Sequence, residues 1–494
     1  MNALKAKLSD GRIVEYFDES IGEGGEKIVH FTTDRQHVAA FYKDSKDADD
    51  PERYARLVSI LTKYNPTKDP KGGSYYKDLF CWPEAIIEQP TLGVVSPVYP
   101  SNFFFKHNKK EKSGKWFIKR TLRNSLPKEE RGNWLNYLQI SILLSRAISR
   151  MHNAGLAHSD LSCNNVLIDP LNSRCSIIDI DSLVVPGMHP PKVLGTKGYI
   201  APEVLQGGAL PSIRTDLHAL AVLFYQYFFM RHPLEGPKIH STASAEEDEM
   251  LSMGKEALFI EHDTDKSNTF SYICTSCGQS FNNEQYKMLN GKCNCGNKLT
   301  PYALPLPYTS FGPYIAELFK KSFVTGLKEP DLRPTATEWE TGLVKTTDLI
   351  LPCSNSNCEG KWFVLLEGNK AVCPFCGTPY NDSVPVLRFF AEKRRGQYFN
   401  ENHRLVVWNG IRMYKWHIFD NVWPSIGSDK TPQGYMMKSG GKWYLCNNGA
   451  DTMKIINQDK LVYPGQQFVL QHGMQIMLST APRGRVAFVE ILNK

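Results

Sequence analysis

The chain has 494 residues, which is too many for one hydrophobic core and enough for roughly two to four domains. With 41% hydrophobic and 22% charged residues it has the composition of a globular protein, which excludes a largely disordered chain. The net charge of +7 is thinly spread, so nucleic acid is an unlikely partner on charge alone. We find no apolar N-terminal segment and no apolar run of membrane-spanning length, and we therefore expect a cytoplasmic protein without a membrane segment.

The first predicted elements form a small β-rich region. Residues 13–43 alternate apolar and polar positions around glycines, which is typical of a β-hairpin followed by the strand HVAAFY. Apolar positions within 51–63 recur at helical spacing, so one helix is expected to pack against these strands. Two further strands are predicted at 85–89 and 92–99.

Helices are expected to dominate the next part of the chain. Residues 134–151 have a long apolar helical pattern, and a loop with a short strand pair follows them. Helical patterns then continue to about residue 345, interrupted by a cysteine-rich insertion at 270–300. A second cysteine-rich module covers 351–380, and short apolar segments between turn residues in 384–494 predict an all-β sandwich.

Polar residues with a spacing suited to phosphoryl transfer follow the long helix. Transfer from ATP needs a carboxylate for the hydroxyl proton, oxygen ligands for Mg²⁺, and backbone or lysine groups on the phosphates. The stretch from His158 to Asn165 matches the kinase loop HRDLxxxN at every defined position but one. We interpret Asp160 as the catalytic base, with Asn165 and Asp179 as Mg²⁺ ligands.

Three more motifs follow in the order that kinases have them. Residues 195–203, which include Thr196 and Glu203, match the end of an activation segment; Asp216 and Arg333 match later positions. On these motifs, residues from about 13 to 345 resemble a eukaryotic-type (Hanks-type) protein kinase.

The resemblance implies a bilobal α+β fold over residues 1–345, with an N-lobe at about 1–100 and a C-lobe at about 101–345. It also implies ATP and Mg²⁺ as cofactors and a protein Ser/Thr kinase activity. Among the structural residues, it implies a buried ion pair between Glu203 and Arg333, a hydrogen bond from Asp216 to the backbone near His158, and a supporting role for Thr196.

The chain departs from the family pattern at three positions near the predicted base. Ser159 replaces the arginine that clamps a phosphorylated activation loop, so control by that route is not expected. Ser162 replaces a lysine that reaches the γ-phosphate in many Ser/Thr kinases. Asp181 replaces the glycine of the DFG motif and places an additional carboxylate near the metal.

Two lysines are candidates for the phosphates. Gly22, Gly24 and Val29 match the glycine-rich nucleotide loop GxGxxGxV. Gly25 lies within this loop, and Lys27 occupies the position of its third glycine. Because side chains alternate along a strand, Lys43 enters the site only if the bulky Phe41 does too. In the other register Val38, Ala40 and Tyr42 point inward, as in kinases that take the lysine from the glycine-rich loop, and we favour Lys27. The predicted helix 51–63 offers only Glu52, at its start, as the usual lysine partner.

Eight cysteines form two quartets with metal-ligand spacing. The first quartet is Cys274, Cys277, Cys293 and Cys295, and the second is Cys353, Cys358, Cys373 and Cys376. Four thiolates suit tetrahedral Zn²⁺, so each quartet predicts a structural zinc ribbon, one inserted in the kinase domain and one after it. We interpret the first ribbon as a substrate-docking element. Ribbons that bind nucleic acid are the alternative, for which Lys361, Trp362 and Phe363 are weak support.

Residues 384–494 loosely resemble a forkhead-associated domain. A phosphothreonine reader needs an arginine with further polar ligands at set spacing, and only Arg412 is a candidate here. We therefore favour a structural interaction domain over a phosphopeptide reader.

The sequence favours a bacterial-type Ser/Thr kinase in stress signalling. Its N-lobe resembles kinases of tellurite-resistance-like gene clusters, which implies a phosphatase of the PP2C class and a von Willebrand A protein as partners. The alternative is a pseudokinase scaffold that acts through its ribbons and sandwich.

Overall fold

The computed structural model describes residues 2–43, 51–191, 195–394, 396–425 and 428–492. The chain divides into two compact units. Unit 1 comprises Met1–Gly132, Asn136–Tyr308 and Glu317–Glu340, and unit 2 comprises Asn133–Leu135, Thr309–Ala316 and Thr341–Lys494. The second cysteine-rich module and the C-terminal sheets therefore belong to one unit.

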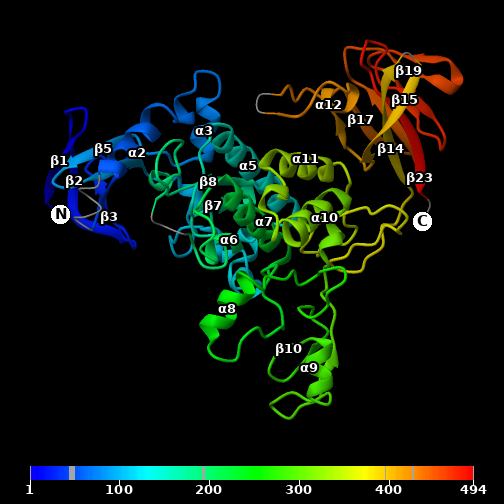
Figure 1. Ribbon diagram of the computed structural model, residues 1–494. Coiled ribbons are helices and arrows are strands. Elements are labelled where there is room, and N and C mark those ends of the chain that lie inside the picture. The colour runs from blue at the N-terminus through cyan, green and yellow to red at the C-terminus, as the bar shows by residue number, and fades with distance from the viewer. Residues whose placement is uncertain (1, 44–50, 192–194, 395, 426–427, 493–494) are drawn as a thin grey trace. The chain divides into compact units, whose positions relative to one another are not determined.

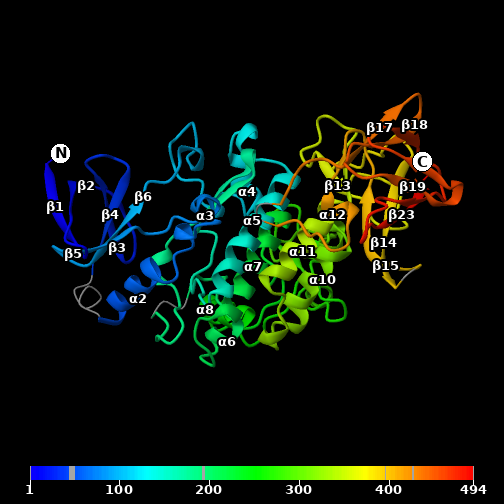
Figure 2. The same cartoon turned by 90° about the horizontal axis from the view of Figure 1, so that it is seen from above.

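Unit 1 begins with a closed antiparallel barrel in the order β1-β2-β3-β4-β6-β5. Its strands are β1 (Ala3–Leu8), β2 (Ile13–Glu23), β3 (Lys27–Thr32), β4 (His37–Tyr42), β5 (Ala85–Gln89) and β6 (Gly93–Pro97). Strand β1, which was not predicted from the sequence, pairs with both β2 and β5 and so closes the barrel. Helix α2 (Pro51–Thr62) buries Leu57, Ile60 and Leu61 and lies beside the barrel in both ribbon views (Figures 1 and 2).

The rest of unit 1 is mainly helical around α7 (Ile213–Phe229), whose residues from Thr215 onward are buried. Such a helix is apolar on all sides because other elements surround it. The ring centroids of Tyr137 on α5 and Tyr227 on α7 lie 6.1 Å apart. The other elements of unit 1 are α3 (Gly73–Leu79), α4 (Arg120–Ser125), β7 (Val166–Asp169), β8 (Arg174–Ile177), α6 (Pro202–Leu205) and α8 (Ala245–Met253). Three helices have residues in both units, namely α5 (Trp134–Asn153), α10 (Pro313–Lys320) and α11 (Ala336–Thr347).

The cysteine-rich insertion of unit 1 has a very small core. Its elements are β9 (Tyr272–Ile273), β10 (Ser280–Phe281), α9 (Asn283–Met288) and β11 (Thr300–Pro301), with the three strands in the order β10-β9-β11. Its buried hydrophobic residues are Cys274, Phe281, Cys293 and Leu299. So few buried side chains make a metal or another cross-link the expected source of stability.

Unit 2 contains a hairpin and two larger sheets. The hairpin is β12 (Ile350–Pro352) with β13 (Trp362–Val364). One sheet has the order β15-β14-β23-β22-β19-β20 and the other β16-β17-β18-β21, and both contribute to one core that includes Phe389, Met436 and Ile476. The bounds are β14 (Val384–Arg394), β15 (Gln397–Val406), β16 (Arg412–Met413), α12 (Lys415–Ile418), β17 (Gly434–Ser439), β18 (Lys442–Asn447), β19 (Met453–Ile455), β20 (Lys460–Val462), β21 (Gln467–Val469), β22 (Gln475–Met477) and β23 (Val486–Leu492).

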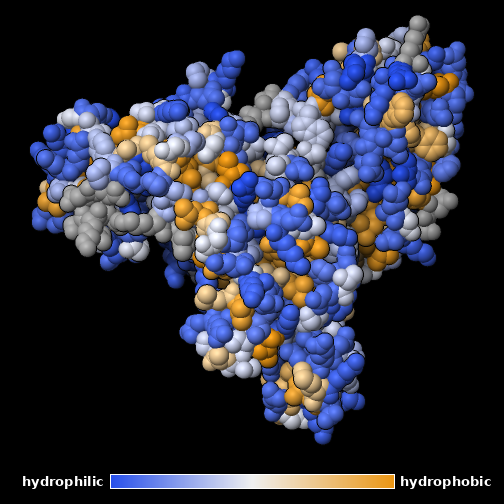
Figure 3. All heavy atoms as spheres, viewed as in Figure 1, coloured by the Kyte–Doolittle hydropathy of each residue, from blue (hydrophilic) through white to orange (hydrophobic). Residues whose placement is uncertain are grey.

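In the described part of the chain, none of the helices combines the length and the apolar character needed to cross a bilayer. On the face drawn in Figure 3, hydrophobic residues lie scattered among hydrophilic ones.

A buried carboxylate in unit 2 joins the end of α11 to the sandwich. Asp348 accepts hydrogen bonds from His403 Nε2 at 2.7 Å and from His417 Nε2 at 3.2 Å. Burial disfavours the charged form, but the two histidines outweigh it and hold the pKa of Asp348 below its usual range. The interaction was not predicted from the sequence.

Replacing this carboxylate should weaken the sandwich. We expect Asp348→Asn to lower the local unfolding free energy at β14 and β15 by about 1–3 kcal/mol, because a buried imidazole loses its acceptor. Hydrogen exchange read by mass spectrometry measures this quantity. The matched control is Asp459→Asn, whose carboxylate pairs with Lys454 at the surface and should change it by less than about 0.5 kcal/mol. Equal effects would contradict the assignment.

Candidate active site

The loop between α5 and β7 is fastened to α7 and to the end of β8. The backbone N–H of His158 donates to Asp216 at 2.7 Å, and the His158 ring donates from Nε2 to the carbonyl of Ile178 at 2.9 Å. Ile178 directly precedes Asp179 in the sequence. The loop carrying Asp160 and the turn carrying Asp179 are thus fixed to each other.

Asp160 lies at the centre of a local hydrogen-bond network. Thr196 Oγ1 donates to its Oδ1 at 2.7 Å. Asn165 Nδ2 donates to the Asp160 carbonyl at 2.8 Å and to its Oδ2 at 3.0 Å, so the amide oxygen of Asn165 is the atom that could face a metal. Asp160, Asn165 and Asp179 all line one cavity of about 380 Å³.

Lys27 enters this cavity from the barrel. Its backbone pairs directly with Tyr42 across β3 and β4, which puts both side chains on the same face of the sheet. Its Nζ lies 2.7 Å from Asp179 Oδ1 and 2.7 Å from Asp181 Oδ1. Lys43 follows Tyr42 on the opposite face and pairs instead with Glu23, at 2.6 Å.

Lys27 and Asp181 stabilise each other's charged forms. Burial alone would lower the pKa of Lys27, but the charges of Asp181 and Asp179 outweigh it and raise that pKa. Burial would also raise the pKa of Asp181, but Lys27 outweighs it and lowers that pKa to about 2. Around neutral pH Lys27 is therefore an ammonium group and Asp181 a carboxylate.

The cavity has the lining that a nucleotide requires. Gly24 and Gly25 line it together with the apolar side chains of Val29, Val38 and Ala40. A second cavity of about 580 Å³ shares Val29, Val38 and Tyr99 with it and is also lined by Ile21, Gly22 and Trp116. Volumes of this size are typical of small-molecule sites. The open space beside Gly22 and Gly25 would let backbone N–H groups approach phosphates.

The remaining kinase-motif residues lie in the helical part. Arg333 forms a bidentate ion pair with Glu203, with Nη1–Oε1 at 2.7 Å and Nη2–Oε2 at 2.8 Å. Its Nη1 also donates to the carbonyl of Arg214. Ser162, at the position of the absent lysine, is buried and accepts from Thr196 at 3.1 Å.

Sequence reasoning missed two contacts at the site. Tyr42 Oη donates to Asp181 Oδ2, and Ser159 Oγ donates to the carbonyl of Ser182 at 3.0 Å. Strand parity indicates that Tyr42 points inward, but no local pattern in the sequence identifies its partner 139 residues away. Ser159 thus joins the loop that carries Asp160 to the segment that follows Asp179 by a neutral contact.

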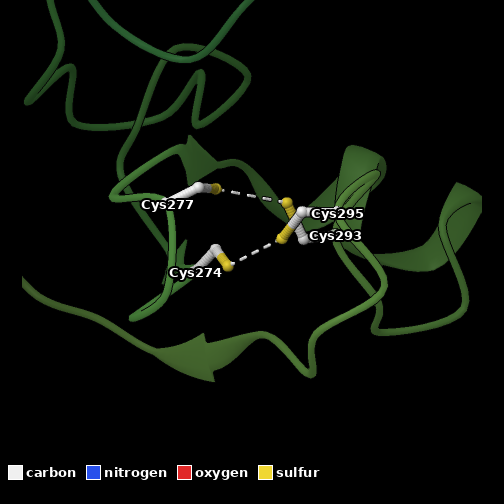
Figure 4. Close-up of side chains that lie close together, drawn as sticks. All are labelled: Cys274, Cys277, Cys293 and Cys295. Atoms are coloured by element: carbon white, nitrogen blue, oxygen red, sulfur yellow. Dashed lines mark hydrogen bonds between the residues drawn. The ribbon is translucent and has the colours of Figure 1, made fainter.

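Each cysteine quartet brings its four sulfur atoms together. In the first, Cys274 Sγ lies 3.5 Å from Cys295 Sγ and Cys277 Sγ 3.6 Å from Cys293 Sγ (Figure 4). In the second, the pairs Cys353–Cys376 and Cys358–Cys373 are 3.5 and 3.7 Å apart. Tetrahedral zinc with Zn–S bonds of about 2.3 Å separates its sulfurs by about 3.8 Å. Both groups could therefore hold a metal ion.

Comparison with known proteins finds similarity to protein kinases over part of the chain. Residues 120–296 match the family model "Protein kinase domain". The chain is 32% identical over 147 residues to the serine/threonine-protein kinase PknD of Chlamydia abortus, which covers 24% of this chain and 15% of PknD. The chain is 32% identical over 99 residues to the DNA damage-responsive serine/threonine-protein kinase RqkA of Deinococcus radiodurans. This match covers 19% of this chain and 15% of RqkA. A dual serine/threonine and tyrosine protein kinase of Apis mellifera is 31% identical over 93 residues, which cover 19% of this chain and 9% of that kinase.

These matches span only a small part of either protein, and the family match starts after the barrel that carries Lys27. The chain covers at most 15% of the length of the three relatives. Within those bounds, the family match and the arrangement around Asp160 agree with the kinase motifs read from the sequence. This chain contains a protein kinase domain.

Proposed function

We propose that the chain transfers the γ-phosphate of ATP to serine or threonine hydroxyls of proteins. The observation that carries the proposal is the convergence of Asp160, Asn165, Asp179 and Lys27 on one cavity of nucleotide size. The named kinase relatives support the same chemistry.

In this proposal each side chain has one task. Asp160 accepts the proton of the attacking hydroxyl, and Thr196 and Asn165 hold its carboxylate in place. Lys27 contacts the phosphates, and the glycine-rich turn supplies backbone N–H groups to them. Asn165 and Asp179 would hold Mg²⁺, which when bound neutralises charge on the phosphate oxygens.

The setting of the reaction is also a proposal. The likeness to RqkA, which is named as DNA damage-responsive, and the resemblance of the N-lobe to kinases of tellurite-resistance-like clusters favour bacterial stress signalling. A PP2C-type phosphatase and a von Willebrand A protein are the proposed partners. The first ribbon remains our candidate for substrate docking, and the sandwich for a structural interaction domain.

The first test removes the proposed base. We expect Asp160→Asn to reduce phosphoryl transfer by about 10²-fold or more, because general-base catalysis contributes about 10²–10⁴-fold. Phosphopeptides formed from Mg·ATP, counted by mass spectrometry, measure the change. Equal phosphopeptide yields from both proteins, or none from the wild type while it binds nucleotide, would favour a pseudokinase scaffold.

The second test compares the two lysines. Lys27→Met should raise the KM for ATP and lower kcat, because the phosphates lose their cation. Lys43→Met is the matched control: Lys43 pairs with Glu23 outside the cavity and its loss should change kcat/KM by less than about twofold. Initial rates over a range of ATP concentrations decide between them, and the reverse order would reject Lys27.

The third test concerns the metal. We expect one Zn²⁺ for each of the two cysteine groups, measured by plasma mass spectrometry of the purified protein. Cys373→Ser removes one buried ligand and should lower the zinc content by one ion per chain. The control is Cys446→Ser, a buried sandwich cysteine outside both groups, which should retain all the zinc. Unchanged zinc in Cys373→Ser would contradict the second site.

A further inference from the structure

The two aspartates that bind Lys27 differ in burial and in their other contacts. Both residues line the cavity, but the Asp181 side chain is 4% exposed and that of Asp179 is 39% exposed. Lys27 Nζ contacts both oxygens of Asp181, at 2.7 and 2.8 Å, and only one oxygen of Asp179. Asp181 also accepts the hydroxyl of Tyr42. The more buried carboxylate is therefore the better anchor.

Protein kinases hold the phosphate-binding lysine with a glutamate from the helix beside the barrel. Here that helix is α2, and its one glutamate, Glu52, is an exposed residue of the first turn. The buried face of α2 carries Arg56, Leu57, Ile60 and Leu61 instead. Within the described residues, the carboxylates in ion-pair contact with Lys27 are Asp179 and Asp181.

We propose that Asp181 is the positioning residue that holds Lys27 against the nucleotide phosphates, in place of the helix glutamate. The inference deepens the proposed function and rests on it. The two carboxylates then have separate roles. Asp179 is accessible to a metal and would bind it, and Asp181 keeps the ammonium group of Lys27 in place when the metal is bound.

The surroundings of Asp181 fit an anchor. Tyr42 occupies the inward strand position next to Ala40 and donates its hydroxyl to Asp181. Arg53 of α2 lies 4.3 Å from the Tyr42 ring centroid and pairs with Glu26, the residue before Lys27, at 3.3 Å. Helix α2 therefore contacts the site indirectly: its Arg53 packs on the Tyr42 ring, and Tyr42 binds Asp181.

The test measures binding of Mg·ADP by isothermal titration calorimetry, so that it needs no phosphoryl transfer. Asp181→Asn keeps the shape of the side chain and removes its charge, and it should weaken binding about ten- to hundredfold. Lys27→Met should have a similar effect. The double variant should bind no more weakly than Lys27→Met alone, since an anchor without its lysine has no further role.

Three further variants complete the test. Tyr42→Phe removes one neutral donor to Asp181 and should weaken binding about two- to tenfold, which keeps the test open if Asp181→Asn fails to fold. Asp331→Asn removes a surface carboxylate that pairs with Arg214 and should leave binding unchanged. Asp181→Glu keeps the charge and should recover part of the affinity that Asp181→Asn loses.

Two results would overturn the proposal. One is independent, additive losses in Lys27→Met and Asp181→Asn. The other is recovery of Asp181→Asn by excess Mg²⁺, which would make Asp181 a metal ligand. If the variants show the coupled losses in Mg·ADP binding but the wild type phosphorylates no protein, this inference stands and the proposed function is rejected. A wild type that binds no Mg·ADP would reject both.

Discussion

A buried carboxylate of unit 1 fixes the loop that carries Asp160, the proposed catalytic base. Asp216 projects from the first turn of α7 and accepts hydrogen bonds from the His158 backbone and, at 3.1 Å, from the His152 ring. A buried carboxylate without hydrogen-bond donors costs free energy. The loop is therefore held against α7 in an arrangement that places these donors on Asp216. Because the His158 ring also binds the Ile178 carbonyl, this anchor sets the position of Asp179 as well as that of Asp160.

The second constraint is electrostatic. Asp179 and Asp181 are two residues apart and would repel each other in a partly buried site, but Lys27 lies between them. The lysine comes from the first residue of β3, so the ion pairs also join the barrel to the helical part of unit 1. A nucleotide with Mg²⁺ brings phosphates that pair with Lys27 and a cation that pairs with the carboxylates. Nucleotide binding therefore acts on the same ion pairs that join the barrel to the helical part of unit 1.

The cysteine-rich modules and the sandwich follow different physical rules. The insertion at 270–300 buries few side chains, so its cysteines are the natural source of its stability. The sandwich has a large apolar core drawn from both sheets and needs no such help. Asp348 adds a buried polar contact at the end of α11, where His403 and His417 come from separate segments of unit 2.

The sequence by itself determined the features that depend on local spacing. The order of the kinase motifs predicted the protein kinase domain that the family match confirms, and the cysteine spacing predicted two groups that could hold metal. Strand alternation, a local rule, pointed Tyr42 inward and Lys43 outward, which is how the structure orients them. These inferences need only a few residues of chain on either side.

Tertiary structure alone decided the contacts between distant segments. Strand β1 is a strand because β2 and β5 pair with it, although its own sequence gives a weak pattern. Lys27 and Asp181 are 154 residues apart, and Asp348 and His417 are 69 apart. Which carboxylate finds which cation depends on how the intervening chain packs, because electrostatic partners are set by distance in space and leave no periodic signal along the sequence.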